Sequence, residues 1–497
     1  MRIAFLYPEM ETLGIQYLSS VLKQKGHQTK LFFDPQLFMD TVMINPKLAN
    51  IFDCSDKIIH GIEEYQPQLV AFSVLSTNYR WACKLARKIK MNFNIPIVFG
   101  GIHPTSVPAA VLQNEFVDFI IMGEGEYALL ELAESEFNKQ LFPMIKNLCY
   151  KNQGEFCYNP LREPVHDLDA LPFPDKELFY ENLPYLQRRY TIITSRGCPH
   201  RCTYCCNDFL NKLYNKKFLR RRSTENVIAE LRWAMTKYEI HSILFDDSTF
   251  TYDKKWLRDF AEKYRDQIGL VCFCWVYPTD VDEELMEIFN TMNCRAVEMG
   301  VESFNADVRK NLFHRFYENR DIEMALALFR KNKIFCTVDN IKGFSPDLEE
   351  EMLELALFYN QHRANKIYIF EYRAFPQTEL ANKLQHKQES SISGILPFTI
   401  ATSATKRRVR QLELVLAFTY FLPRFLVKLV IKKRLYRFFP PLPSYNLLEI
   451  VPYFINLFRI TKNSSLFYVM RGTRKRYVHS FLSDFPYFLK RIMGLWA

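Results

Sequence analysis

Short apolar runs alternate with helical patterns over the first 130 residues. The runs RIAFLY, TKLFFD, LVAFSV, IPIVFG and VDFIIMG are typical of buried strands, and GIQYLSSVLKQKG and NYRWACKLARKIK have the spacing of amphipathic helices. This βα alternation predicts a doubly wound, Rossmann-like parallel sheet. Ligands of such sheets bind beyond the carboxyl ends of the strands. The loops that contain Ser73, Gly100, Gly101 and Gly123 therefore lie at the expected binding edge.

The same alternation returns from Tyr190, after a segment that contains the sequences LCYKNQGEFCYNP and DLDALPFPDKELF. The first sequence predicts a hairpin, and the second is rich in proline and typical of a linker. Beyond the linker follow about six βα units, beginning with YTIIT, ENVIAELRWAMTKY and SILFDD. We therefore expect a partial (βα)6 barrel of the TIM type, with its active site at the C-terminal ends of the strands.

From Lys406 onward the pattern changes to apolar and aromatic segments broken by basic clusters. This tail holds 18 Lys and Arg residues against three acidic residues, together with 19 aromatic residues, so it is more positive than the whole chain, whose net charge is +10. One uncharged apolar run, from Leu414 to Pro423, is about half the ~20 residues of a membrane span. We expect an α-helical region that covers a substrate cavity or contacts an anionic membrane surface. A purely structural cap stays open, and no nucleic acid is expected because no RNA-binding module is recognisable.

Two features of the composition bear on the compartment. The apolar run at the N-terminus gives way at once to Pro8 and Glu9, so no secretion signal is visible. Twelve cysteines in so long a chain argue against a disulfide scaffold. We expect a reducing, cytoplasmic location. The basic tail also suggests peripheral contact with the inner face of the membrane.

The sequence SRGCPHRCTYCC places Cys198, Cys202 and Cys205 at the spacing C-x3-C-x2-C, directly after the first predicted barrel strand. Three thiolates can ligate three irons of a [4Fe-4S] cluster and leave the fourth iron open for a ligand. A zinc site is the alternative, but zinc prefers four ligands, and the nearby Cys206 and His200 crowd the same loop. The spacing favours the cluster and leaves zinc open.

At this point the chain resembles the radical S-adenosylmethionine (SAM) superfamily, in its branch with an N-terminal cobalamin (B12)-binding domain. The signature of that superfamily is C-x3-C-x-Φ-C, and Tyr204 supplies the aromatic position. The blocks FLRRRSTENVIAEL, LFDDSTFTYD and AVEMGVESFN follow in the family's order, and LGIQYLSSVLKQKGH, GGIHP, GEGE and LPFPD resemble its cobalamin domain and connector. The resemblance covers about 80 per cent of the chain.

The resemblance implies three cofactors and a division of the chain. The cofactors are a [4Fe-4S] cluster on the three cysteines, SAM and cobalamin. The expected SAM contacts are Tyr204, Gly300, Glu302 and Ser303, and the expected corrin contacts are Ser73, Gly100, Gly101 and Gly123. The expected segments are a cobalamin-binding domain (1–141), a Pro-rich linker (142–189), a radical SAM barrel (190–405) and a basic, aromatic-rich helical domain (406–497).

The sequence also departs from the family's patterns. It lacks the D-x-H-x-x-G pattern that supplies an axial histidine to cobalt in many cobalamin proteins, so His103 is not assigned that role. Where the family often shows G-x-P-G-E and P-G-T, this chain has GFSPD at 343–347 and PQT at 376–378. Contacts from the late barrel strands are therefore the least transferable.

The family's chemistry implies an enzyme in which a reduced cluster passes one electron to SAM, and the resulting 5'-deoxyadenosyl radical removes hydrogen from an inert carbon. The leading hypothesis is a methyltransferase that acts on an unactivated carbon of a lipid, tetrapyrrole or specialised metabolite. One alternative is a cyclase, oxidase or rearrangement enzyme of the same architecture, and another is a non-enzymatic iron-sulfur protein. The expected partners are a small-molecule or lipid substrate and a reductant such as flavodoxin or ferredoxin. No catalytic side chain is assigned.

Two groups of charged residues near the expected site each allow a functional and a structural interpretation. Asp246 and Asp247 end a strand at the active-site face, so contact with a polar group of substrate or SAM and a strand-end cap are both open. The run Arg220–Arg222 before a helix predicts a mostly solvated surface, with a clamp for an anionic substrate as the alternative.

Three further cysteines are interpreted as packing residues. Cys206 adjoins Cys205, and neighbouring residues rarely both reach one cluster. Cys272 and Cys274 alternate along an apolar strand, so both side chains are expected on one face, in the core.

Overall fold

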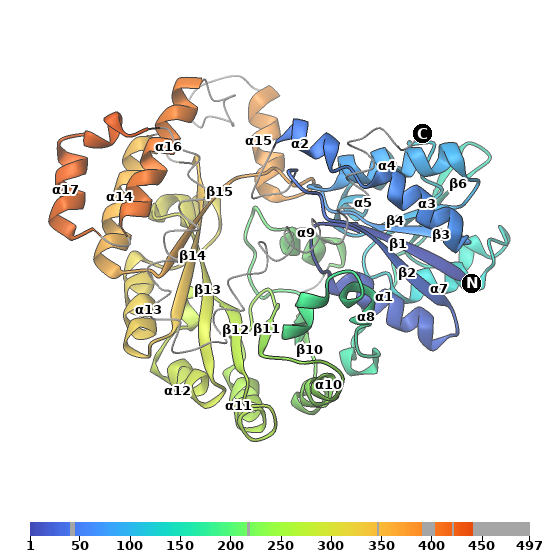
Figure 1. Cartoon of the computed structure of the whole chain (residues 1–497), viewed down its shortest axis with the longest axis horizontal. Helices are drawn as coiled ribbons and strands as arrows, with labels where there is room; N and C mark the ends of the chain where they lie inside the picture. The colour runs from blue at the N-terminus through green and yellow to red at the C-terminus, as the bar shows by residue number, and fades with distance from the viewer. Residues whose placement is uncertain (40–44, 216–218, 345–346, 390–402, 420–421, 441–497) are drawn as a thin grey trace. The chain divides into compact units, whose positions relative to one another are not determined.

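The structure, a computed structural model, describes residues 1–39, 45–215, 219–344, 347–389, 403–419 and 422–440. Among these residues the chain forms two compact units, 1–187 and 188–440. Each unit is built on a sheet with helices packed against it (Figure 1). The two units are described separately below.

The first unit contains a seven-stranded sheet with the strand order β2-β1-β3-β4-β5-β6-β7. Its first five strands pair in parallel, which confirms the predicted doubly wound sheet. The strands are β1 (Arg2–Pro8), β2 (Gln28–Asp34), β3 (Leu69–Ser73), β4 (Ile97–Gly100), β5 (Phe119–Ile121), β6 (Leu148–Asn152) and β7 (Glu155–Tyr158). The antiparallel pair β6–β7 is the predicted hairpin, so the sheet continues into residues that the sequence suggests as a linker.

Helices of the first unit follow the strands in βα order. They are α1 (Leu13–Gln24), α2 (Pro46–Ile51), α3 (Ser55–Tyr65), α4 (Tyr79–Asn92), α5 (Ile102–Ser106), α6 (Pro108–Leu112), α7 (Glu126–Glu134) and α8 (Glu177–Tyr180). The central strand β1 is buried at every position after Arg2, as expected for a parallel strand that is covered on both faces. This burial explains why the strand sequences read as continuous apolar runs.

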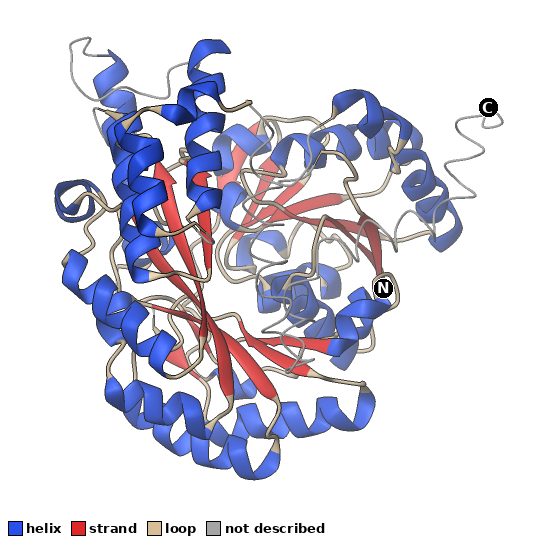
Figure 2. Ribbon diagram, turned by 60° about the vertical axis from the view of Figure 1, so that its left-hand side comes forward, coloured by secondary structure: helices blue, strands red, loops and turns tan. Residues whose placement is uncertain are grey.

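The second unit contains six parallel strands in the order β15-β14-β13-β12-β11-β8, with helices along their outer side (Figure 2). This sheet is the predicted partial (βα)6 barrel. Its strands are β8 (Arg189–Ile192), β11 (Ser242–Phe245), β12 (Val271–Val276), β13 (Cys294–Glu302), β14 (Phe335–Lys342) and β15 (Lys366–Glu371). A two-stranded ribbon of β9 (Ser195–Arg196) and β10 (Arg220–Arg221) joins the first strand to the first large helix.

Most helices of the second unit pack against one large hydrophobic core, whereas Leu380 of α15 belongs to a smaller cluster. They are α9 (Cys206–Leu213), α10 (Thr224–Lys237), α11 (Lys254–Gln267), α12 (Glu283–Thr291), α13 (Asn319–Lys331), α14 (Leu348–His362), α15 (Glu379–Glu389), α16 (Ser403–Phe418) and α17 (Arg424–Lys432). Cys272 and Cys274 lie fully inside this core, as the alternation along β12 predicts.

The described part of the basic tail belongs to the second unit. Helices α16 and α17 pack against α14, and Leu412, Val415 and Leu416 are buried in the barrel's core. The Asn360 side chain donates to the carbonyl oxygen of Thr419 at 3.0 Å, which fixes the end of α16. The described helices α16 and α17 therefore pack on the barrel, whereas residues 420–421 and 441–497 lie outside the described residues.

Candidate functional site

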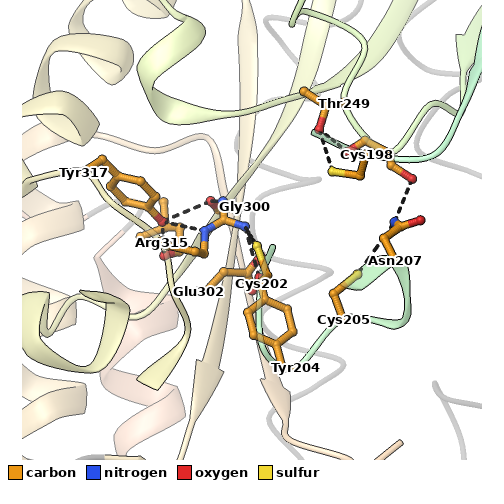
Figure 3. A network of polar contacts seen from close by, with 12 residues as sticks. Cys198, Cys202, Tyr204, Cys205, Asn207, Thr249, Gly300, Glu302, Arg315 and Tyr317 are labelled. Carbon is orange, nitrogen blue, oxygen red and sulfur yellow. Dashed lines mark hydrogen bonds and ion pairs between the residues drawn. The ribbon is translucent and has the colours of Figure 1, made fainter. Parts of the chain in front are cut away.

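The three cysteines of the motif lie on the loop that follows β8 and the β9 ribbon (Figure 3). Gly197 precedes the first of them with a φ of +92°, a left-handed conformation that favours glycine. Helix α9 begins directly after Cys205. The local sequence therefore reverses the chain at Gly197 and presents all three thiols from one short segment.

All three thiols are free and close enough to influence one another. Burial, opposed by the Arg315 charge, raises the pKa of Cys202 to about 11, and the Cys205 and Cys198 thiols contribute to this rise. Burial likewise raises the pKa of Cys198. Buried or half-buried thiols so close together are unfavourable as free thiolates, and bound iron would compensate their negative charge. The donor set fits a cluster held by three cysteines.

The two other candidate ligands of the loop, His200 and Cys206, have contacts of their own. Among the residues that the structure describes, no three His, Cys, Asp or Glu side chains surround a position for one metal ion. His200 stacks face to face on Tyr277, with ring centroids 3.8 Å apart. Cys206 touches Cys205 and raises the pKa of that thiol well above its ordinary value. The exclusion of Cys206 as a ligand stays a prediction.

Each of the three thiols has a polar neighbour of its own (Figure 3). The Thr249 hydroxyl lies 3.5 Å from the Cys198 sulfur, and the Asn207 amide donates to the Cys205 sulfur at 3.7 Å. The Arg315 guanidinium donates to the Cys202 sulfur at 3.7 Å. Sequence reasoning missed these partners, because no local pattern links them to the cysteine motif.

Arg315 contacts three of the residues that are expected to bind SAM. Its Nη1 donates to the Tyr204 hydroxyl at 3.0 Å and lies 3.4 Å from the Glu302 carboxylate, and its Nη2 donates to the Gly300 carbonyl oxygen at 2.5 Å. The side chain is buried and also lies over the ring of Tyr277. Tyr204, Gly300 and Glu302 thus gather beside Cys202, and their contact with SAM stays a prediction.

The end of β13 is shaped to hold the Glu302 carboxylate in place. A register shift between Gly300 and Glu302 marks a bulge, and Glu302 has a φ of +65°, a strained backbone for a residue other than glycine. A Cβ on Gly300 would lie 2.6 Å from the Glu302 Oε1 atom, so glycine leaves the space that the carboxylate occupies. Ser303 is buried, and its hydroxyl accepts from the Asn305 backbone N–H, which builds the following turn.

Asp247 holds the loop before the cysteines in position. Its buried carboxylate accepts from the Thr194 backbone N–H at 3.0 Å, from the Thr194 hydroxyl at 3.0 Å and from the Ser195 hydroxyl. Burial raises its pKa, and the Arg221 charge lowers it. Of the two interpretations left open by the sequence, these contacts favour the structural one.

The prediction that Arg220–Arg222 is mostly solvated is wrong. Arg222 is 5% exposed and forms a 2.6 Å ion pair with the fully buried Glu230. The Arg221 guanidinium lies 4.2 Å from the centre of the Trp256 ring and donates to the Phe250 carbonyl oxygen. The β10 ribbon turns these side chains inward, so they attach the loop after the cysteine motif to the barrel.

In the first unit, the structure brings three predicted loops to one edge of the sheet. Ser73 pairs in register with Gly100, and the Thr105 hydroxyl donates to the Gly101 carbonyl oxygen and accepts from the Gly123 N–H. Thr105, which sequence reasoning missed, therefore ties two of the loops together. His103 is buried there, and its Nδ1 lies 2.9 Å from the Ser76 hydroxyl oxygen.

Gly101 is required by the backbone of the protein itself. Its φ is +99°, and a Cβ would lie 2.9 Å from both the backbone nitrogen and the carbonyl oxygen of Val74. The clash is with the protein itself, so it needs no ligand. At Gly100, by contrast, a Cβ would make only ordinary contacts, of which the nearest is 3.8 Å. Gly100 is therefore the better position for testing close approach of a bound group.

Comparison with known proteins gives matches over both units. The family model described as B12 binding domain matches residues 2–133, and the one described as Radical SAM superfamily matches residues 192–359. An uncharacterized methyltransferase of Pyrococcus horikoshii is 26% identical over 351 residues, which cover 68% of this chain and 71% of that protein. The anaerobic magnesium-protoporphyrin IX monomethyl ester cyclase of Rubrivivax gelatinosus is 23% identical over 417 residues, covering 78% and 71%.

Solved structures show the same fold. The radical S-adenosylmethionine methyltransferase TsrM from Kitasatospora setae, with cobalamin and a [4Fe-4S] cluster bound, matches with a TM-score of 0.62 at 17% identity. The match covers 81% of this chain and 80% of that chain. At this identity the likeness concerns the fold.

Proposed function

The chain belongs to the radical SAM superfamily and carries an N-terminal B12-binding domain, and from this premise we propose that it methylates an unactivated carbon of a lipid, tetrapyrrole or specialised metabolite. The observation that carries the proposal is the group of three free thiols on one loop, beside the Arg315, Gly300 and Glu302 group at the end of β13. The similarity to a methyltransferase over two thirds of the chain supports it.

In such an enzyme the bound cofactors remove hydrogen from carbon and supply a methyl group. The protein binds and orients the cofactors and the substrate, and it excludes water from the site. Cys198, Cys202 and Cys205 would hold the cluster, and the buried guanidinium of Arg315 keeps Tyr204 and Glu302 in fixed positions beside it. The Asp247 carboxylate accepts hydrogen bonds from Thr194 and Ser195, and these bonds hold the start of the cysteine loop in position. These residues provide positioning, and no acid or base is assigned.

Anaerobic reconstitution with iron, sulfide and hydroxocobalamin tests the proposal. The reduced protein should convert SAM to 5'-deoxyadenosine, and SAM with a deuterated methyl group should transfer the label to the protein-bound corrin. The first result alone would fit a cyclase, which the relative from Rubrivivax gelatinosus keeps open. A corrin that stays unlabelled favours the cyclase, and absence of deoxyadenosine contradicts both enzymes.

Corrin binding should depend on the loop edge of the first unit. In the full-length protein, Gly101→Val should abolish corrin absorbance after reconstitution, since its Cβ meets the Val74 backbone. Gly100→Ala should weaken binding without unfolding the loop, because no protein atom lies closer than 3.8 Å to the new Cβ. Gly154→Val is the matched control: its φ is +87°, but open space surrounds it, so corrin binding should persist. Full corrin binding by Gly101→Val would contradict the assignment of this edge.

We also propose that the α17 patch contacts an anionic membrane surface. The patch is an exposed mixture of apolar and cationic side chains on residues 423–440, a segment without acidic residues. Phe425 is 68% exposed and Phe438 is 85% exposed. The other members are Leu429, Leu435, Arg424, Lys428, Lys432, Lys433 and Arg434, whereas Arg437 forms an ion pair with Glu349 at 3.1 Å. Each Lys or Arg near an anionic lipid surface contributes about 1 kcal/mol, so several together can hold the protein there.

Vesicle flotation measures this contact. The full-length protein should float with vesicles that contain phosphatidylserine at low salt and detach as salt screens the charges. Phe425→Ser with Phe438→Ser should reduce flotation, whereas Met144→Ser, which removes an equally exposed apolar side chain from the first unit, should not. Failure of the wild-type protein to float with these vesicles at low salt would disprove the contact.

Within the described residues, no helix is both long and apolar enough to cross a bilayer.

A further inference from the structure

We propose that Arg315 sets the reduction potential of the cluster that Cys198, Cys202 and Cys205 would hold. Arg315 is then a positioning residue that acts through the Cys202 thiolate. The inference rests on the proposed function, because it requires the cluster. It adds a tuning role to a residue that lies 113 positions beyond Cys202 in the sequence.

The direct contact with sulfur carries the inference. The Nη1 atom donates to the Cys202 sulfur at 3.7 Å, which is within hydrogen-bonding range for sulfur. Reduction adds one negative charge to the cluster and its thiolates. Hydrogen bonds to the sulfur ligands and nearby positive charge stabilise that added charge, and these are known determinants of cluster potential. Arg315 supplies both.

The guanidinium is held so that it cannot turn away from the thiolate. Its Nη2 donates to the Gly300 carbonyl oxygen at 2.5 Å and its Nε donates to the Tyr317 hydroxyl at 3.2 Å. Its carbon centre lies 4.4 Å from the centre of the Tyr277 ring. The residue is only 6% exposed, so water screens its charge little. The arrangement fixes a positive charge at one place beside the sulfur.

Glu302 opposes this effect. Its carboxylate lies 3.4 Å from the same Nη1 atom and places a negative charge beside the arginine. Arg315 donates to the Cys202 sulfur, so the positive end of the pair faces the cluster ligand. Removing the arginine and removing the acid should therefore shift the potential in opposite directions. A purely structural role of the pair would not produce opposite signs.

The experiment is a redox titration of the reconstituted full-length protein with sodium dithionite and mediators, followed by the EPR signal of the reduced cluster. No SAM is present, and each cluster accepts one electron from the titrant without breaking a bond. Arg315→Met should disfavour reduction by about tenfold, a fall of ~59 mV for a one-electron couple. The potential should fall less in Arg315→Lys, because this variant keeps the positive charge. It should rise in Glu302→Gln, because this variant removes the negative charge.

Arg309→Met is the matched control. Arg309 is another buried arginine of the same region, and it donates to the carbonyl oxygens of Ser303 and Phe304. Its other hydrogen bonds go to the Tyr317 carbonyl oxygen and the Asn319 side chain, so the folded variant should keep the wild-type potential.

Other outcomes separate this inference from the function on which it rests. If wild-type protein binds no cluster, the proposed function fails and this inference fails with it. If wild-type titrates normally while Arg315→Met and Glu302→Gln leave the potential unchanged, or shift it in the same direction, only the inference is wrong. Weaker SAM binding by Arg315→Met at an unchanged potential would make Arg315 a SAM contact instead.

Discussion

Replacing Cys198, Cys202 or Cys205 with alanine, one at a time, is expected to reduce deoxyadenosine formation to background. Each substitution removes one of three thiolate ligands, and a cluster held by two is no longer anchored on its three irons. The reconstituted wild-type protein should be brown, oxygen-sensitive and contain about four irons and four sulfides per chain. Iron and sulfide content, the visible spectrum and deoxyadenosine are the measurements.

Two substitutions serve as controls for this experiment. Cys206→Ala changes a thiol that adjoins the motif, and it should keep the cluster and SAM cleavage. Cys274→Ala removes a buried thiol from the barrel's core, away from the cysteine loop in sequence, and should keep the cluster as well. If any single alanine variant of the three motif cysteines retains SAM cleavage, the ligand assignment is incorrect. Loss of cleavage in Cys206→Ala would make that residue a fourth participant.

Breaking the Arg222–Glu230 pair is expected to cause the largest loss of stability. Arg222→Met removes the ion pair and leaves the Glu230 carboxylate fully buried, where it accepts a hydrogen bond from the Tyr190 hydroxyl at 2.8 Å. An uncompensated buried charge of this kind costs about 3–5 kcal/mol. The free energy of unfolding of the barrel, measured by denaturant titration, should fall by this amount.

The matched control lies on the same helix. Arg232 is an exposed arginine of α10, so Arg232→Met should change the unfolding free energy by less than about 0.5 kcal/mol. The double variant Arg222→Met, Glu230→Met should recover part of the stability lost in Arg222→Met, because it removes the unpaired charge. A double variant that is less stable than either single variant would show that packing, and not charge, governs this site.

The sheets and the cysteine loop follow from local sequence. Parallel strands buried on both faces read as apolar runs, so β1 or β12 can be recognised without knowing its neighbours. The spacing of Cys198, Cys202 and Cys205 is also a local property, because one short loop carries all three. The same local logic places Cys272 and Cys274 on one face of a strand.

Local patterns mislead where a side chain's environment comes from distant parts of the chain. The charge run at Arg220–Arg222 suggests a solvated surface, but pairing of β10 with β9 directs Arg222 to Glu230 inside the barrel. There, tertiary packing overrides composition. The described start of the basic tail also packs on the core that contains Leu412, and its division from the barrel as a separate domain stays a prediction.

The surroundings of the cluster loop depend entirely on the fold. Arg315 reaches Cys202 because the end of β13 and the turn after Leu312 return to the cysteine loop, where the Thr203 N–H donates to the Phe313 carbonyl oxygen. No spacing in the sequence encodes a contact between residues 113 positions apart. The donor set for the metal can thus be identified from a motif, because one loop carries it. The charges and hydrogen bonds that tune it arise only when separate strands bring their ends together.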